Sequence, residues 1–184
     1  MKRVLVFLAQ GSEEMEAIVV SDLLRRAGIE VTIAGESKEI TTARKTKIIP
    51  DILIGEINEN DLYDLVYVPG GSKGVENLIK IQKVGDILKN HYNKSKLIAA
   101  ICAGPLVLHY FGIFSKEQKL TSHPNVSDIL KIYNYSTDKV VEDRGIITSR
   151  GAGTSVDLAL YLIKKLIDQS AAENVAKAIV YSKD

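Results

Sequence analysis

"KLIAAICAGP", residues 96–105, contains the only cysteine of the chain at the end of an apolar run. A short uninterrupted run of this kind is typical of a parallel strand that is buried on both faces. Gly104 and Pro105 follow the cysteine, and proline fits the first turn of a helix because its missing N–H is not needed there. The segment therefore predicts a strand, a tight turn that holds Cys102, and a helix.

The same alternation of strand and helix patterns extends along the whole chain. Apolar runs lie at 3–9, 30–36, 64–71 and 96–103, and segments with helical spacing lie at 13–27, 73–93, 105–112, 154–167 and 170–181. This alternation predicts an α/β fold with a mostly parallel central sheet, and 184 residues fit a single domain over 1–184. Two segments break the pattern. Residues 38–57 predict a small hairpin or edge excursion, and residues 139–150 a hairpin that turns at 143–145.

The composition limits the classes of function. The chain has 24 Lys and Arg against 23 Asp and Glu, a net charge of +1, so we expect no polybasic face and no nucleic-acid partner. Its apolar runs are shorter than the roughly 18–20 residues of a membrane span. Only Met1 and Lys2 precede the first run, which is read as a strand and not a signal peptide. A lone cysteine cannot form an internal disulfide, which suits a reducing cytoplasm.

Cys102 has the surroundings of a nucleophile. The segment from Ala100 to Gly104 follows the pattern small-x-nucleophile-x-Gly, related to the G-x-S-x-G elbow in which a strained strand-to-helix turn exposes the reacting side chain. A thiol at a helix N-terminus is also expected to ionise more easily. The alternative is a buried structural cysteine, and the segment by itself leaves both interpretations open.

Glu16 is a candidate partner for this cysteine. In "GSEEMEA", residues 11–17, Ser12 is placed to cap a helix, while Val19, Val20 and Leu23 share the helix face of Glu16. A desolvated carboxyl keeps its proton and can donate a hydrogen bond to a thiolate. The alternative is a glutamate at the start of a helix that reaches solvent.

Two further loops supply candidate groups. Gly70 and Gly71 follow a predicted strand, so the backbone N–H groups of this loop, with the amide of Ala103, could stabilise a negatively charged oxygen; a simple turn is the alternative. His123 in "LTSHP" is a candidate third catalytic group or a solvent-facing loop histidine. His91 and His109 lie in helical segments and are interpreted as structural or solvated. Without a Cys/His cluster we expect no metal site.

Six segments together resemble a known family. "LAQGSEEMEA", "RRAGIEVTIAG", "VPGGSKG", "LIAAICAGP", "LTSHP" and "ITSRGAGTS" occur in the order found in the ThiJ/PfpI superfamily, in the branch that contains the Parkinson's disease protein deglycase. The resemblance implies a flavodoxin-like three-layer sandwich with a nucleophile elbow, and a homodimer. It also implies a site with a reactive cysteine that matches Cys102, a protonated glutamate that matches Glu16 and a histidine that matches His123. Two oxyanion-binding amides match Gly71 and Ala103, and an anion-binding edge matches Arg26 and Arg44.

The resemblance also suggests a reaction. Related members are described as glutathione-independent glyoxalases, as deglycases of methylglyoxal or glyoxal adducts, and as oxidative-stress proteins with chaperone activity. We therefore expect a cysteine-dependent enzyme without a cofactor that acts on small dicarbonyls or glycated side chains. The alternative is a stress protein without significant turnover, either a redox sensor that forms a Cys102 sulfinate or a holdase chaperone. Ala103 stands where protease-like members have a histidine, which disfavours a peptidase.

Overall fold

The first strand, β1 (Arg3–Leu8), shows why the chain forms layers. Successive side chains of a strand point to opposite faces. Leu5 and Phe7 belong to one apolar cluster, while Val4, Val6 and Leu8 belong to another, and all five are fully buried. The uninterrupted apolar run therefore belongs to a sheet that is covered on both faces. This computed structural model describes residues 1–58 and 60–182.

The central sheet has seven strands in the order β10, β11, β7, β6, β1, β2, β5. All neighbours in it are parallel except β10 and β11, which confirms the predicted mostly parallel sheet. Beyond β1, its strands are β2 (Glu30–Gly35), β5 (Ile52–Leu53), β6 (Leu65–Val68), β7 (Leu97–Ile101), β10 (Val140–Asp143) and β11 (Ile146–Ser149).

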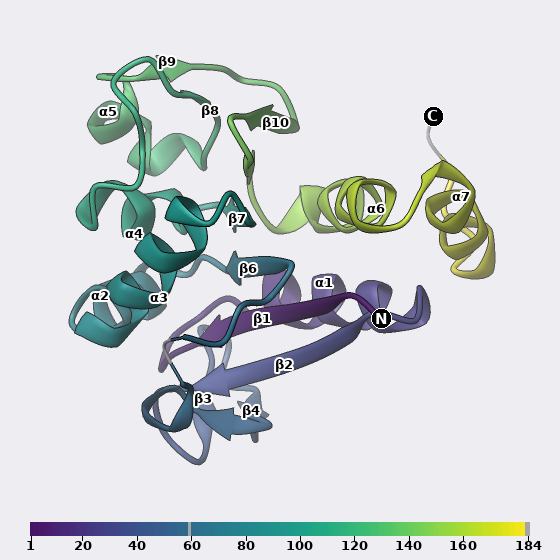
Figure 1. Cartoon of the computed structure of the whole chain (residues 1–184), viewed down its shortest axis with the longest axis horizontal. Helices are drawn as coiled ribbons and strands as arrows, with labels where there is room; N and C mark the ends of the chain where they lie inside the picture. Colours follow the sequence, from purple (N-terminus) through teal and green to yellow (C-terminus); the bar gives the residue numbers. More distant parts are fainter. Residues whose placement is uncertain (59, 183–184) are drawn as a thin grey trace.

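Helices form the two outer layers, so the expected three-layer α/β sandwich is confirmed. One apolar cluster joins the sheet to α2 (Ser72–Ile79), α3 (Gln82–Asn93) and α4 (Pro105–Tyr110). The other joins it to α1 (Glu14–Arg26), α6 (Ser155–Leu166) and α7 (Gln169–Ala178). Figure 1 shows α2, α3 and α4 grouped on one side of the molecule and α6 and α7 on the other. Short helices complete the chain: η1 (Ile54–Glu56), η2 (Pro124–Val126), α5 (Ser127–Leu130) and η3 (Ala152–Thr154).

Both predicted interruptions are hairpins. Within 38–57, β3 (Ile40–Thr41) and β4 (Lys47–Ile48) pair antiparallel, and β5 then joins the edge of the central sheet. Within 139–150, β10 and β11 pair antiparallel. Arg144 and Gly145 both have positive φ, 52° and 79°, as a tight hairpin turn requires. A separate small sheet pairs β8 (Lys119–Leu120), which ends shortly before His123, with β9 (Asn134–Tyr135).

Two local expectations are wrong. The helical segment 73–93 is not one helix, because Ile81 has an extended backbone, with φ −96° and ψ 97°, between α2 and α3. Ser12 does not cap α1. Glu13 occupies that position, and Ser12 is fully buried with its Oγ accepting a 3.0 Å hydrogen bond from the amide of Ala9. The hydroxyl thus closes the turn that follows β1.

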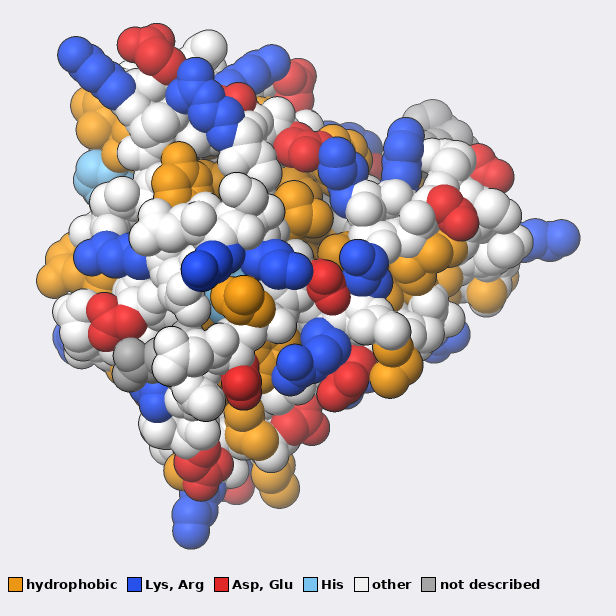
Figure 2. All heavy atoms as spheres, in the orientation of Figure 1, with side chains coloured by type: hydrophobic (Ala, Val, Ile, Leu, Met, Phe, Trp, Pro, Cys, Tyr) orange, Lys and Arg blue, Asp and Glu red, His pale blue; other side chains and the backbone are white. Residues whose placement is uncertain are grey.

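The surface carries both signs of charge. On the face drawn in Figure 2, basic and acidic side chains are interspersed, with apolar side chains between them. This mixing agrees with the net charge of +1. Among the helices built from described residues, none combines the length and the apolar character needed to cross a membrane.

Candidate active site

The candidate site lies where the carboxyl ends of β1, β6 and β7 meet. These strands are neighbours in the sheet and run parallel, so the loops that follow them share one edge. A cavity of about 1050 Å³ opens there. The structure brings all five predicted core residues of the site to its wall: Glu16, Gly71, Cys102, Ala103 and His123.

Cys102 occupies a strained turn between β7 and α4. Its φ of 62° lies in the left-handed region that non-glycine residues rarely adopt. The Cys102 amide donates a 3.0 Å hydrogen bond to the carbonyl of Ser149, and the amide of Gly104 donates one of 2.7 Å to Ile101. A Cβ on Gly104 would lie 2.6 Å from the carbonyl oxygen of Val68, so glycine is needed there. This geometry confirms the nucleophile elbow.

Glu16 is buried beneath the cysteine, with 1% of its surface exposed. It lies on the face of α1 that also buries Val20 and Leu23, as the spacing predicted, while Val19 is half-buried. Its Oε2 accepts a 2.7 Å hydrogen bond from the amide of Gly70. Burial raises the pKa of Glu16 to about 7, although hydrogen bonds from Cys102 and from the Gly70 amide lower it. A substantial fraction of the protein therefore carries a neutral Glu16 carboxyl near neutral pH.

The thiol of Cys102 does not have the lowered pKa expected from its place before a helix. Burial, then the negative charge of Glu16 and a hydrogen bond with it, raises the pKa of Cys102 to about 12. The amides of Gly71 and Ala103 lower it but do not outweigh these effects. An ionised sulfur at neutral pH thus requires that Glu16 keep the proton, since the repulsion disappears when that carboxyl is neutral.

The amides of Gly71 and Ala103 both point at the sulfur of Cys102 and bond to it. Gly71 has a φ of 86°, and a Cβ there would lie only 2.4 Å from the carbonyl oxygen of Gly11. Glycine is therefore required at this position, both for the backbone angle and for the close approach. Two N–H donors in this arrangement can stabilise negative charge on the sulfur, or on an oxygen of a ligand whose carbon is bonded to the sulfur.

His123 lies on the same cavity wall but is held by other groups. Its amide donates a 2.9 Å hydrogen bond to the carbonyl of Cys102, which fixes the loop against the elbow. Its ring Nδ1 accepts a 3.2 Å hydrogen bond from the amide of Asn125. In the part of the chain that the structure describes, no hydrogen bond joins the His123 ring to the Cys102 sulfur.

The two predicted arginines are separated. Arg44 lies on the cavity wall, and its amide donates hydrogen bonds of 3.1 Å to both carboxylate oxygens of Glu14. Arg26 is not among the residues that line the cavity, and its Nε forms a 2.7 Å ion pair with Asp22 one turn earlier on α1. Of the two predicted arginines, Arg44 is therefore the one placed to contact a ligand in this cavity.

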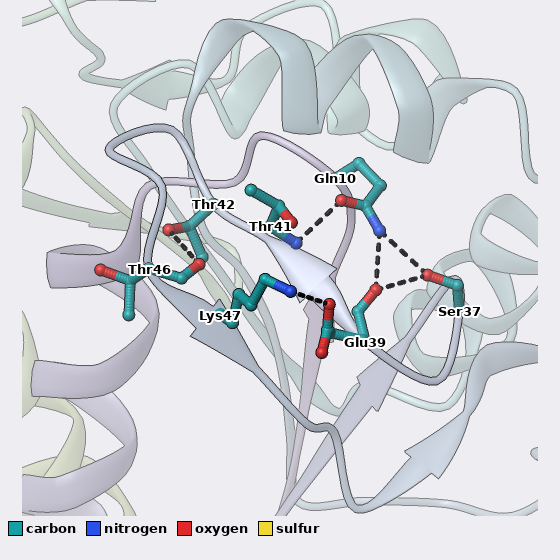
Figure 3. Close-up of polar contacts among 7 residues, drawn as sticks. All are labelled: Gln10, Ser37, Glu39, Thr41, Thr42, Thr46 and Lys47. Atoms are coloured by element: carbon teal, nitrogen blue, oxygen red, sulfur yellow. Dashed lines mark hydrogen bonds and ion pairs between the residues drawn. The ribbon is translucent and has the colours of Figure 1, made fainter.

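The hairpin that carries Arg44 forms one wall of the cavity. The sequence pattern predicted the hairpin but not its place at the site. Gln10, in the loop after β1, holds it in place (Figure 3). Its Oε1 accepts a 2.8 Å hydrogen bond from the amide of Thr41, and its Nε2 donates to the carbonyl of Glu39 at 2.7 Å and to Oγ of Ser37 at 3.1 Å. Gln10 was overlooked because these partners lie 27–31 residues away in sequence. Its only sequence signal was its place directly after a buried strand.

The described side chains include no group of three or more His, Cys, Asp or Glu placed to hold a metal ion.

Comparison with known proteins finds relatives that match nearly the whole of this chain. It is 42% identical over 185 residues to Protein DJ-1alpha of Drosophila melanogaster, covering 98% of this chain and 85% of that protein. It is 34% identical over 177 residues to Glutathione-independent glyoxalase DJR-1.2 of Caenorhabditis elegans, covering 95% of this chain and 93% of that one.

A solved structure agrees with the architecture. The structure of oxidized Toxoplasma gondii DJ-1 superposes with a TM-score of 0.93 at 34% identity, covering all of both chains. Residues 2–165 match the DJ-1/PfpI family as a whole. With its elbow, its buried glutamate and these relatives, the chain belongs to the DJ-1/PfpI family.

Proposed function

We propose that the protein is a glyoxalase that uses Cys102 as its nucleophile and converts methylglyoxal-type dicarbonyls to hydroxy acids without glutathione. The observation that carries the proposal is the contact of a strained, half-buried cysteine with a buried glutamate whose pKa is about 7. Two amides face the same sulfur, from Gly71 and Ala103. The relative named as a glutathione-independent glyoxalase supports the choice of reaction.

The first step is addition to the aldehyde. In the reactive form Glu16 holds a proton and the Cys102 sulfur carries the negative charge. The sulfur attacks the aldehyde carbon, C1, and the C1 oxygen takes the proton from Glu16, which gives a hemithioacetal and a Glu16 carboxylate. The amides of Gly71 and Ala103 stabilise the charge as it moves from sulfur to oxygen.

The second step is an isomerisation followed by hydrolysis. Removal of the C1 proton gives an enediolate, a proton passes from the C1 oxygen to the C2 oxygen, and C2 takes up a proton, which leaves a lactoyl thioester. Water then cleaves the thioester and restores the thiolate. Methylglyoxal and water become lactate and a proton, so no redox partner is required. Glu16 and His123 are the groups on the cavity wall that can take part in these transfers.

The size of the cavity supports adducts as additional substrates. At about 1050 Å³ it is far larger than a three-carbon dicarbonyl, and Arg44 lies on its wall. An aminocarbinol or hemithioacetal adduct on a protein side chain would present the same electrophilic carbon to Cys102. This deglycase activity is tested with the methylglyoxal adducts of N-acetyl-lysine and N-acetyl-cysteine.

The test is a turnover assay on purified protein with methylglyoxal and without glutathione. We expect lactate to form enzymatically in the wild type and only at the uncatalysed rate in Cys102→Ser, whose folding is checked by circular dichroism. A wild-type protein that forms lactate no faster than the buffer contradicts the proposal.

A second candidate is a redox sensor, and the relative whose solved structure is described as oxidized favours it. Peroxide would convert the Cys102 thiolate first to the sulfenic and then to the sulfinic acid, which Glu16 and the amides of Gly71 and Ala103 could hydrogen-bond. Mass spectrometry after peroxide treatment distinguishes the candidates. Two added oxygens on Cys102 in a protein without turnover favour the sensor.

The homodimer is also a proposal. On α1, Met15 and Ile18 are 53% and 42% exposed and lie one turn apart, so they form an apolar strip on the outside of the chain. Sedimentation equilibrium of the wild type and of Met15→Lys measures the association state. A wild type that sediments as a monomer contradicts the dimer.

A further inference from the structure

The ring of His123 is held at one nitrogen by a backbone amide. The N–H of Asn125 donates a 3.2 Å hydrogen bond to Nδ1 of His123. An amide nitrogen can only donate, so Nδ1 must present a lone pair, and the single proton of the neutral ring is then on Nε2. We propose that the Asn125 amide is a positioning group that fixes His123 as the Nε2–H tautomer and makes it a hydrogen-bond donor to the substrate.

The rest of the loop supports this assignment. Asn125 lies in η2, which begins at Pro124 directly after His123, and the amide of Val126 bonds to the carbonyl of His123. The amide of His123 is bonded to the carbonyl of Cys102. The backbone of His123 is therefore held on both sides by hydrogen bonds, which fixes the position of the ring. Its Nε2 has no hydrogen-bond partner among residues 1–58 and 60–182. Nε2 is free to meet a ligand in the cavity that His123 lines.

His91 has the opposite arrangement and is a natural reference. It is fully buried in α3, its Nε2 accepts a 2.9 Å hydrogen bond from the amide of Tyr63, and its Nδ1 lies 2.8 Å from the carbonyl oxygen of Ile87. A carbonyl can only accept, so His91 must carry its proton on Nδ1. The two histidines are thus expected to be opposite tautomers in one folded chain.

If the proposed reaction is correct, the tautomer assigns different roles to His123 and Glu16 in it. An Nε2 that carries a proton has no lone pair, so it cannot remove the proton from C1. It can donate a hydrogen bond to the oxygens of the enediolate as negative charge develops there. The base is then the Glu16 carboxylate formed in the first step, which takes the C1 proton and later returns it to C2.

Nuclear magnetic resonance tests the tautomer without any assay of activity. Long-range ¹H–¹⁵N correlation spectra distinguish protonated from unprotonated ring nitrogens, and they are recorded at about pH 8, above the ordinary imidazole pKa of about 6.5. His123→Ala identifies the His123 signals. We expect Nε2–H for His123 and Nδ1–H for His91 in the wild type. A His123 ring with its proton on Nδ1 overturns the proposal, whatever the enzyme does.

Two variants of Asn125 then connect the tautomer to the reaction. Asn125→Ala keeps the backbone N–H, whereas Asn125→Pro removes it in the first turn of η2, next to Pro124. We expect Asn125→Ala, which changes a side chain on the cavity wall but keeps the amide, to keep the wild-type His123 tautomer. In Asn125→Pro we expect a mixture of tautomers and a kcat about tenfold lower, with a smaller change in KM.

The outcomes are distinguishable. A lowered kcat in Asn125→Pro with an unchanged His123 tautomer overturns the role of the amide, as does an equal change of tautomer in Asn125→Ala. If Asn125→Pro does not fold, the wild-type spectrum alone still decides the tautomer. A wild type without turnover contradicts the proposed function, while the spectrum continues to test the tautomer.

Discussion

The amide of Gly70 donates a 2.7 Å hydrogen bond to the carboxyl of Glu16, across 54 residues of sequence. The same glycine faces the cysteine, since a Cβ on Gly70 would lie 2.6 Å from Oε2 of Glu16 and 2.7 Å from Cβ of Cys102. Gly70 thus allows the carboxyl and the thiol to approach each other in a buried space. The reactivity and the pH dependence of the protein follow from this close approach.

The first prediction concerns the reactivity of Cys102. Glu16→Leu removes the proton donor from a buried sulfur, so we expect the rate of alkylation by iodoacetamide at pH 7 to fall by at least about tenfold, which corresponds to a thiol pKa higher by about one unit. Glu16→Gln keeps an N–H donor without a charge and should remain reactive. The measurement is the pH profile of alkylation. Faster alkylation of Glu16→Leu at pH 7 would mean that Glu16 acts mainly as a negative charge that suppresses ionisation of the sulfur.

The second prediction concerns stability against pH. The pKa of Glu16 is raised from 4.5 to about 7 on folding, so its contribution is fully present below the unfolded pKa of 4.5 and is lost as the pH rises through 7. This group should lower the free energy of unfolding by about 3 kcal/mol between pH 4 and pH 8. Urea unfolding at several pH values measures the slope, and Glu16→Gln, which cannot titrate, is the control. Equal slopes in both proteins would show that Glu16 has an ordinary pKa in the folded chain.

The third prediction uses two glycines that differ only in their surroundings. Gly70→Ala places a methyl group against Glu16 and Cys102, whereas nothing lies within 4 Å of a Cβ on Gly153. We expect Gly70→Ala to lower lactate formation on the order of 100-fold by displacing the sulfur, and Gly153→Ala to resemble the wild type. Wild-type turnover in Gly70→Ala would show that the carboxyl and the thiol need not be this close.

The fourth prediction concerns backbone strain at Cys102, where φ is 62°. Cys102→Ala and Cys102→Gly both remove the sulfur, but only glycine adopts this angle without steric cost. We expect Cys102→Gly to be more stable than Cys102→Ala by about 1 kcal/mol in urea unfolding. This result would separate the cost of the turn from the loss of the thiol. A glycine variant less stable than the alanine variant would contradict strain at this turn.

The fifth prediction concerns the hairpin wall. Gln10→Glu keeps the acceptor for Thr41 but replaces the donor that bonds to Ser37 and Glu39 with an oxygen. We expect faster amide hydrogen exchange in residues 40–48, by about tenfold, and a higher KM for side-chain adducts with little change in kcat. Gln82→Glu, in an exposed pair on α3, is the matched control. Unchanged exchange would show that other contacts are sufficient to hold the hairpin.

The fold class and the central residues of the site could be predicted because they depend on local patterns. Uninterrupted apolar runs indicate strands that are buried on both faces, and β1 and β7 are such strands. The segment Asp143-Arg144-Gly145 indicated a tight hairpin, and the small residues around Cys102 indicated an elbow. Glu16 was placed on a buried face by helical spacing alone. Each of these inferences compares residues that are close together in sequence, within about two helical turns or within one tight turn.

Packing between distant segments decided the rest. It brought Arg44 but not Arg26 to the cavity. It also reversed the expected shift of the Cys102 pKa, because burial and a charge 86 positions earlier in the chain outweigh the neighbouring amides. The sequence by itself determined the order of strands and helices along the chain, since backbone preference and apolar spacing are local. Only the tertiary structure decided which groups lie within hydrogen-bond distance and how far each is removed from water, because both depend on contacts between residues far apart in the chain.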